Sequence, residues 1–157
     1  MDRYAIKSLF ILLLAVVSCS HQTDSYTRYV DVKIGTGGHG HVSVGANVPF
    51  GVVQLGPTSI PQQWDWCSGY HDSDSTVIGF SHTHLSGTGI GDLFDVTDMP
   101  VTGDVTFARG TEDEPDSGRW SYADRTREIA RPGYYSVPLL RYGITAELTV
   151  YAPTSDR

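Results

Sequence analysis

Short apolar segments separated by turn-forming residues run through most of this 157-residue chain, and no segment keeps the apolar period of a long amphipathic helix. The alternation is clearest near the C-terminus, where Ile144, Ala146 and Leu148 alternate with Thr145 and Glu147. The other segments that we expect to be strands are 26–34, 52–55, 76–80, 101–107 and, after a turn, the second part of 129–140. Many short strands between turn signals predict an all-β chain with the architecture of a β-sandwich.

The composition indicates one globular domain, because 39% of the residues are hydrophobic and 18% are charged. The formal net charge is -7 at pH 7, and no cluster of Lys and Arg offsets it. An acidic surface repels the phosphates of a nucleic-acid backbone, so we expect no nucleic-acid partner.

Residues 1–18 are typical of a signal peptide. Arg3 and Lys7 supply positive charge, and the apolar run 9–17 is too short to span a bilayer well. A small residue followed by Cys19 resembles a bacterial lipoprotein signal, in which Cys19 becomes the lipidated first residue of the mature chain. The alternative is an ordinary secretory signal in which Cys19 occurs by chance.

With Cys19 lipidated, residues 19–25 form a tether and residues 26–157 form the folded domain. The protein then belongs to the periplasm or outer membrane of a Gram-negative bacterium, attached to the membrane through its lipid anchor. Cys67 is left without a partner in the same chain, so we expect no disulfide framework.

The segments 64–71 and 79–92 differ from a structural core. Together they hold two Trp, three His and five Gly, and neither a helical nor a strand period persists through them. Glycine allows positive φ or a close approach to a ligand, while Trp, His and Asp provide a stacking plane beside donors and acceptors. We therefore predict a ligand-contacting loop surface that the flanking strands support.

A glycine-rich loop at 35–41 contains His39 and His41. It lacks the Gly-Lys-Ser/Thr ending of a phosphate-binding loop. Two His two residues apart share one face of a strand, a spacing that metal sites use, but the glycines make a strand doubtful here. The favoured interpretation is a pair of hydrogen-bonding side chains, and the alternative is a metal hydrolase that also uses His82 and His84.

Several carboxylates lie in the same region, and a glycosidase needs a pair of them. For most of them, turn capping and loop hydrogen bonding is the favoured role. We assign no catalytic acid or base and no metal ligand in these residues. The carboxylates are Asp65, Asp72, Asp74, Asp92, Asp95 and Asp98.

Four motifs occur in order: Gly35-Thr-Gly-Gly-His-Gly-His41, Val48-Pro-Phe-Gly-Val-Val-Gln-Leu55, Trp64-Asp-Trp-Cys-Ser-Gly-Tyr-His71 and Ile78-Gly-Phe-Ser-His-Thr-His-Leu-Ser-Gly-Thr-Gly-Ile-Gly-Asp92. Together they resemble the N-terminal domain of glycoside hydrolase family 92, the exo-acting α-mannosidases, and the likeness covers residues 29–149. It implies a galactose-mutarotase-like supersandwich that packs on an (α/α)6 barrel, with the mannose site at the junction. Such enzymes are described as calcium-dependent and inverting, and they cleave α-mannosides such as the α-1,2 linkages of N-glycans or mannans.

In the family pattern Trp64 lines the sugar site, and the general acid, the general base and most calcium ligands belong to the barrel. Mannose-containing glycans and the barrel domain are therefore the expected partners. The residues of this chain that we expect to contact the sugar are Trp64, Asp65, Cys67, His39, His82, His84, Gly38 and Gly87.

The C-terminal end departs from the family. The tail 151–157 stops resembling it where a strand should continue, and a sandwich of this type is incomplete at residue 157. We therefore expect a truncated domain that is inactive by itself. The alternative from another class is a stand-alone carbohydrate-binding lipoprotein, which would bind mannosides without barrel residues.

Overall fold

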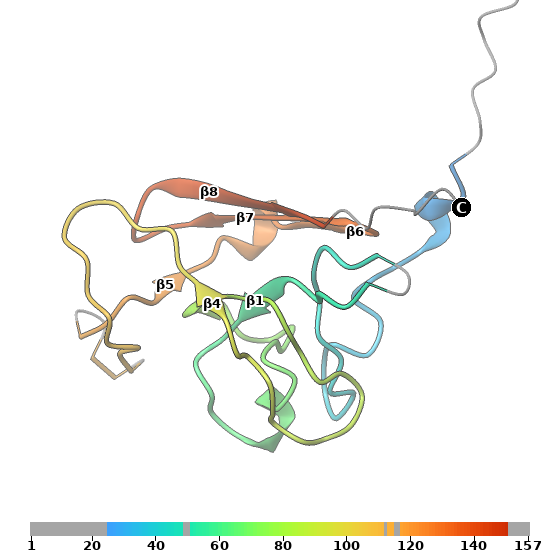
Figure 1. The fold of residues 1–157 in the computed structure, drawn as a ribbon, viewed down its shortest axis with the longest axis horizontal. Helices are drawn as coiled ribbons and strands as arrows, with labels where there is room; N and C mark the ends of the chain where they lie inside the picture. The colour runs from blue at the N-terminus through green and yellow to red at the C-terminus, as the bar shows by residue number, and fades with distance from the viewer. Residues whose placement is uncertain (1–24, 49–50, 112, 115–116, 151–157) are drawn as a thin grey trace, which may run out of the picture.

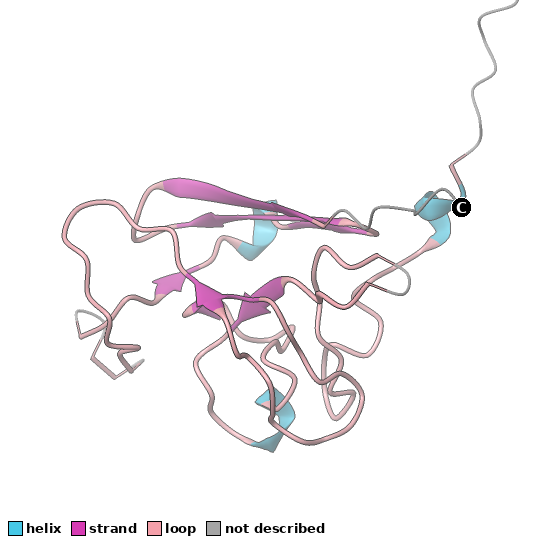
Figure 2. Cartoon of the chain, in the orientation of Figure 1, coloured by secondary structure: helices cyan, strands magenta, loops and turns pink. Residues whose placement is uncertain are grey.

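The computed structural model describes residues 25–48, 51–111, 113–114 and 117–150. Over these residues the chain is all-β, with short 3-10 helices and no α-helix (Figure 2). No helix in this part of the chain has the length and apolar character needed to cross a bilayer. The elements are η1 (Tyr26–Tyr29), β1 (Gly56–Thr58), η2 (Trp64–Trp66), β2 (Thr76–Val77), β3 (Gly79–Ser81), β4 (Thr97–Asp98), β5 (Ser121–Tyr122), η3 (Arg125–Arg127), β6 (Ile129–Arg131), β7 (Tyr134–Leu139) and β8 (Ile144–Thr149).

The strands form three antiparallel sheets, with orders β6-β7-β8, β1-β3-β4 and β2-β5. The longest pairing joins β7 to β8, from Tyr134 opposite Thr149 to Leu139 opposite Ile144. Figure 1 shows the β6-β7-β8 sheet as one layer and the shorter strands as a second layer facing it. The long loops extend from the second layer, on the side away from β6-β7-β8, and these loops carry the candidate site.

The hydrophobic core lies between the two layers. Tyr135 and Val137 of β7 are fully buried and belong to one cluster with Tyr70, Val77 and Phe80. Burial of such side chains stabilises a fold by about 1.5–3 kcal/mol each, before the entropy cost of ordering them. This packing of sheet against sheet confirms the predicted β-sandwich.

Some of the predicted strands are correct. Alternation identified β8, and the turn followed by a strand at 129–140 contains β7. The predicted strand 76–80 exists as two pieces, β2 and β3, which pair with different sheets. The strand β6, before the turn, was not predicted.

Other predicted strands are wrong. Residues 26–34 form η1 and a series of turns, in which the backbone N–H of Lys33 donates to Asp31 Oδ1 at 2.9 Å. The segment 52–55 precedes a strand instead of forming one, and 101–107 is irregular with Phe107 86% exposed. No described strand pairs with 26–34 or 101–107, and without a partner an alternating pattern has no preferred conformation. In the third segment the Gln54 N–H donates to the carbonyl O of His82 and the Leu55 carbonyl O accepts from the Ala46 N–H, but these bonds do not extend into a strand ladder.

A buried ionic cluster ties the loops to the core. The carboxylate of Glu128 accepts from Arg125 Nη1 at 2.5 Å and from Tyr135 OH at 2.5 Å, and it pairs with Lys33 Nζ. Burial raises the pKa of Glu128, but the charges and hydrogen bonds of Arg125, Lys33 and Tyr135 outweigh it, so the net pKa is lowered. The Glu128 side chain is 1% exposed, and it holds the turn that leads into the glycine loop.

The same network continues to η2. Arg125 donates from Nε and Nη2 to the carbonyl O of Asp74, at 2.9 and 2.8 Å. The Asp74 Oδ2 atom in turn accepts from the indole N–H of Trp66 at 2.6 Å. A continuous set of polar contacts thus runs from Glu128 in the core to the base of the loop that carries the site.

Candidate functional site

Two histidines of the glycine loop converge on one carboxylate of η2. Asp65 Oδ1 accepts from His39 Nδ1 at 2.7 Å and from His41 Nε2 at 3.0 Å. We call these three residues the Asp65 cluster. The prediction that His39 and His41 act as hydrogen-bonding side chains is confirmed, although no strand places them on a common face.

The backbone of the glycine loop is folded tightly, and this fold brings His39 and His41 to Asp65. A Cβ atom at Gly40 would lie 2.0 Å from the carbonyl O of Gly35, so only glycine fits there. His41 itself has φ of 54°, a left-handed conformation that is rare for a residue with a side chain. Such conformations persist only where the surroundings enforce them, and here the result is a His41 ring aimed at Asp65.

Trp64 forms an exposed platform beside the cluster. Trp64 is 61% exposed, yet its indole N–H donates to the carbonyl O of Gly89 at 2.8 Å. The His41 ring meets the indole edge-on, with ring centroids 4.2 Å apart. The backbone N–H of Gly87 also donates to the His41 carbonyl O at 2.6 Å. Two other segments, the glycine loop and residues 87–89, therefore fix the position of a solvent-facing aromatic face.

The electrostatics keep Asp65 ionised. The hydrogen bond from His39, followed by that from His41, lowers the pKa of Asp65 below its ordinary value. An ionised carboxylate only accepts hydrogen bonds, so Asp65 suits the binding of hydroxyl or N–H donors and does not suit proton donation to a leaving group.

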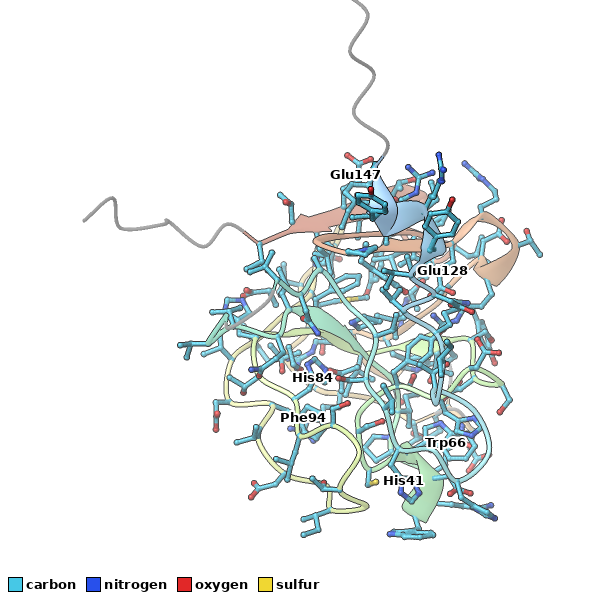
Figure 3. The ribbon with its side chains drawn as sticks, turned by 90° about the vertical axis from the view of Figure 1, so that its right-hand side faces the viewer. His41, Trp66, His84, Phe94, Glu128 and Glu147 are labelled. Atoms are coloured by element: carbon cyan, nitrogen blue, oxygen red, sulfur yellow. The ribbon has the colours of Figure 1, made fainter. Side chains whose placement is uncertain are left out.

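Two of the predicted site histidines lie elsewhere. His84 is buried, with Nδ1 2.8 Å from the carbonyl O of Gln54 and Nε2 3.3 Å from Thr58 Oγ1. Its ring packs edge-on against Phe94, with ring centroids 5.3 Å apart. The two residues lie near each other in Figure 3. His82 instead pairs with Asp98 at 2.9 Å. The described residues therefore do not assemble the four-histidine metal site considered from the sequence; His39 and His41 are grouped with Asp65 alone.

The remaining predicted residues surround η2. Gly38 has φ of 56°, and its carbonyl O lies 3.2 Å from His71 Nε2. Cys67 ends η2 and borders a cavity of about 320 Å³, and burial raises the pKa of its thiol. Trp66 borders the same cavity.

Trp66 is the more enclosed of the two η2 tryptophans. The stretch is a 3-10 turn and not an extended strand, so the two indoles do not alternate across a sheet. Trp66 stacks on His71 with centroids 4.3 Å apart and donates to buried Asp74. In Figure 3, His41 and Trp66 lie together at the end of the molecule opposite Glu128.

Sequence reasoning placed Gly89 and His71 in the predicted loop surface and Asp74 among the hydrogen-bonding carboxylates, but it did not give the contacts that these residues make around η2. The contacts that give them their roles join residues distant in sequence or depend on turn geometry, such as the backbone carbonyl of Gly89 that receives the Trp64 N–H. The one available signal for Gly89 was its place in the run of alternating glycines from Gly87 to Gly91.

Calcium, which the family resemblance implies, does not fit the Asp65 cluster. Ca²⁺ takes about six to eight oxygen ligands, whereas this cluster offers two imidazole nitrogens and one carboxylate.

The fold and the loop surface define the class of protein, a β-sandwich domain whose loops carry a candidate ligand site, and comparison with known sequences gives the family. The family model described as the glycosyl hydrolase family 92 N-terminal domain matches residues 29–155. The chain therefore belongs to this family.

Solved structures of an α-mannosidase of family 92 from Bacteroides thetaiotaomicron are similar to this chain. One matches with a TM-score of 0.77 and 44% identity, over 83% of this chain and 18% of that chain. The other, in complex with mannoimidazole, matches with a TM-score of 0.75 and 44% identity, over 80% of this chain and 16% of that chain.

A curated relative is also similar, an uncharacterized secreted glycosidase of Arthroderma benhamiae. It is 29% identical over 147 residues, which are 88% of this chain and 18% of the relative. The chain thus spans less than a fifth of the length of these relatives.

Proposed function

We propose that this chain supplies the aromatic wall of a mannose-binding site in an exo-α-mannosidase. The single observation that carries the proposal is Trp64, which is exposed and yet fixed by Gly89 and His41. An ordered aromatic face binds the C–H surface of a sugar at low entropic cost, because the ring has already lost its freedom.

Asp65 complements this platform. Its carboxylate, held ionised by His39 and His41, is a strong acceptor for sugar hydroxyls beside the ring. An apolar face flanked by a few fixed polar groups is the usual composition of a small-molecule site. Mannose-containing glycans are the proposed ligands, in keeping with the mannoimidazole complex of the similar Bacteroides enzyme.

The hydrolytic groups are proposed to lie outside these residues. Inverting hydrolysis uses an acid and a base roughly 6.5–9.5 Å apart on opposite sides of the bond. We propose that residues corresponding to the unmatched part of the relatives, in an (α/α)6 barrel, supply this pair and most ligands of a calcium ion. The 157 residues alone are then inactive on α-mannosides, including α-1,2 linkages.

An extracytoplasmic location is proposed on two grounds. The similar glycosidase of Arthroderma benhamiae is described as secreted, and the first 18 residues are typical of a signal peptide. Residues 1–18, Cys19 and nearly all of the 19–25 tether lie outside the described residues, so the lipid anchor at Cys19 stays a prediction. Mass spectrometry of the mature N-terminus tests it.

The experiment for the sugar site compares two exposed aromatic residues. Binding of α-1,2-mannobiose to the full chain is measured by ligand-observed NMR, and release of mannose is assayed in parallel. Trp64→Ala should weaken binding at least tenfold, about 1.4 kcal/mol, whereas Phe107→Ala, 86% exposed and outside the described site contacts, should not change it.

Equal binding by wild type and Trp64→Ala, in chains with unchanged circular dichroism, would remove Trp64 from the site. Turnover of mannobiose by the full chain would contradict its proposed inactivity. Binding without turnover is expected under both the enzyme-part proposal and the alternative of a stand-alone binding lipoprotein. These two are separated by the reading frame downstream of Arg157, which continues into a barrel domain only in the first.

A further inference from the structure

The ligand atoms of the Asp65 cluster are of the types that bind divalent metal ions. We propose that His39, His41 and Asp65 bind a first-row divalent metal ion such as Zn²⁺, an activity separate from the proposed contact with sugar. Their three candidate ligand atoms lie within 4.8 Å of one another, and within the described residues this is the one group of three or more His, Cys, Asp or Glu side chains that converges so closely.

The spacing of these atoms is close to that of a metal site. Zinc binds histidine nitrogen and carboxylate oxygen at about 2.0–2.2 Å, so two ligands of a tetrahedral ion lie about 3.4 Å apart. Here the two nitrogens are 2.7 and 3.0 Å from Asp65 Oδ1. The cluster must open by roughly half an ångström per contact to admit the ion.

The three side chains differ in exposure, and the most exposed one, His39, can move to admit the ion. The side chains of His41 and Asp65 are 7% and 21% exposed, and the left-handed backbone of His41 fixes the direction of its ring. The His39 side chain is 80% exposed, so it can swing outward and close again over an ion. Two fixed ligands and one mobile ligand give an entry path without disturbing the core.

The ligand types select the metal. Imidazole nitrogen suits Zn²⁺, Ni²⁺ and Cu²⁺, whereas Ca²⁺ and Mg²⁺ prefer oxygen. Because a carboxylate only accepts, His39 Nδ1 and His41 Nε2 carry the protons in the metal-free cluster. When the ion binds, each neutral ring carries its proton on the other nitrogen, His39 Nε2 and His41 Nδ1, and three protein ligands leave one position of a tetrahedral ion for water.

Another histidine of the same chain serves as a control. His82 pairs with Asp98 at 2.9 Å, which resembles one arm of the Asp65 cluster but lacks a second histidine. Its side chain is 39% exposed, so its replacement should not disturb the fold. A metal that binds any exposed His-Asp pair would be affected equally by His82→Ala and His39→Ala.

The first measurement is calorimetric titration of the full chain with Zn²⁺, followed by the same titration with Ca²⁺. We expect one saturable Zn²⁺ site, at least a tenfold loss of affinity in His39→Ala and Asp65→Asn, and no loss in His82→Ala. His39→Ala removes a mostly exposed ring, so it reports even where Asp65→Asn fails to fold. Absence of saturable Zn²⁺ binding, or unchanged binding by His39→Ala, as thiol ligation would give, overturns the proposal.

The second measurement locates the ion. Cu²⁺ bound at the cluster would lie next to Trp64, whose ring centroid is 4.2 Å from that of His41, and should quench its fluorescence. We expect quenching to saturate in the wild type and to be smaller in Trp64→Phe, which keeps all three ligands and retains Trp66 in η2. Equal quenching in Trp64→Phe places the ion elsewhere and overturns the proposal. Neither readout uses mannosides, so each result is independent of the proposed sugar site.

Discussion

The indole N–H of Trp64 donates to the carbonyl O of Gly89 at 2.8 Å, and a side chain at Gly89 would crowd Trp64 and His41. A Cβ atom at Gly89 would lie 3.1 Å from Trp64 Cζ2 and 3.3 Å from His41 Nδ1. The Trp64 platform, residues 87–91 and the Asp65 cluster are therefore one packed unit. A side chain at Gly89 must shift Trp64 or His41.

Replacing Gly89 with alanine tests this unit, and Gly87→Ala is the matched control. Both glycines have left-handed φ, 70° and 76°, so either substitution introduces backbone strain of about 1–3 kcal/mol. Only Gly89→Ala also crowds Trp64, because nothing lies within 4 Å of a Cβ at Gly87. We expect Gly89→Ala alone to shift tryptophan fluorescence and to weaken mannobiose binding. Identical spectra for the two variants would contradict the coupling.

The buried carboxylate of Glu128 should dominate the stability of this half of the molecule. Glu128→Gln removes the carboxylate partner of Arg125 and leaves Lys33 with its contact to Asp72 at 3.2 Å, and breaking a buried ion pair costs about 3–5 kcal/mol. Glu147→Gln is the control, since Glu147 is exposed and accepts from Tyr134 OH at 2.8 Å. Urea unfolding should show a large loss for Glu128→Gln and less than about 1 kcal/mol for Glu147→Gln. Equal losses would show that the cluster contributes little.

Because of the same carboxylate, we expect the free energy of unfolding to depend on pH in the acid range. The pKa of Glu128 is lowered in the folded chain, against an ordinary value of 4.5. Its contribution is therefore present above about pH 4.5 and is lost as the pH falls through the folded pKa. The free energy of unfolding should decline below pH 4.5 in the wild type and decline less steeply in Glu128→Gln. A slope that the substitution leaves unchanged would assign the acid sensitivity to other groups.

Local patterns predicted part of the fold. The alternation of Ile144, Ala146 and Leu148 identified β8, because one face of that strand packs on the core while the other is solvated. The segment 101–107, with Val101, Val105 and Phe107 on one face, was also expected to be a strand but is irregular, since a strand also needs a neighbour that accepts its hydrogen bonds. Whether such a neighbour exists depends on tertiary structure, which a local pattern does not contain.

The residue types of the site could be predicted, but their grouping could not. Trp64, Asp65, His39 and the glycines were identified as a ligand-contacting surface from composition and from the resemblance. The contacts of Asp65 with the two histidines, however, span 26 and 24 residues of sequence. His84 shows the opposite error, because a histidine in a glycine-rich motif resembles a ligand contact even when it is a buried structural group.

His84 should give the chain a second pH dependence, at higher pH than that of Glu128. Its Nδ1–H donates to the carbonyl O of Gln54, and its Nε2 lies 3.3 Å from Thr58 Oγ1, so the neutral ring satisfies both nitrogens. Burial lowers the pKa of His84 below 6.5, although the hydrogen bonds to the backbone of Gln54 and Pro57 oppose the change. A lowered pKa means that unfolding takes up a proton.

The contribution of His84 to stability is therefore complete above about pH 6.5 and is lost as the pH falls through the folded pKa. His84→Asn keeps an N–H for the Gln54 carbonyl but cannot titrate, so it should cost about 1–3 kcal/mol at pH 7.5 and flatten the curve just below pH 6.5. Urea unfolding of both chains at half-unit pH steps from 7.5 to 5.0 measures this. A wild-type curve that is level over that range, or one that His84→Asn reproduces with the same slope, would show that the ring takes up no proton on unfolding.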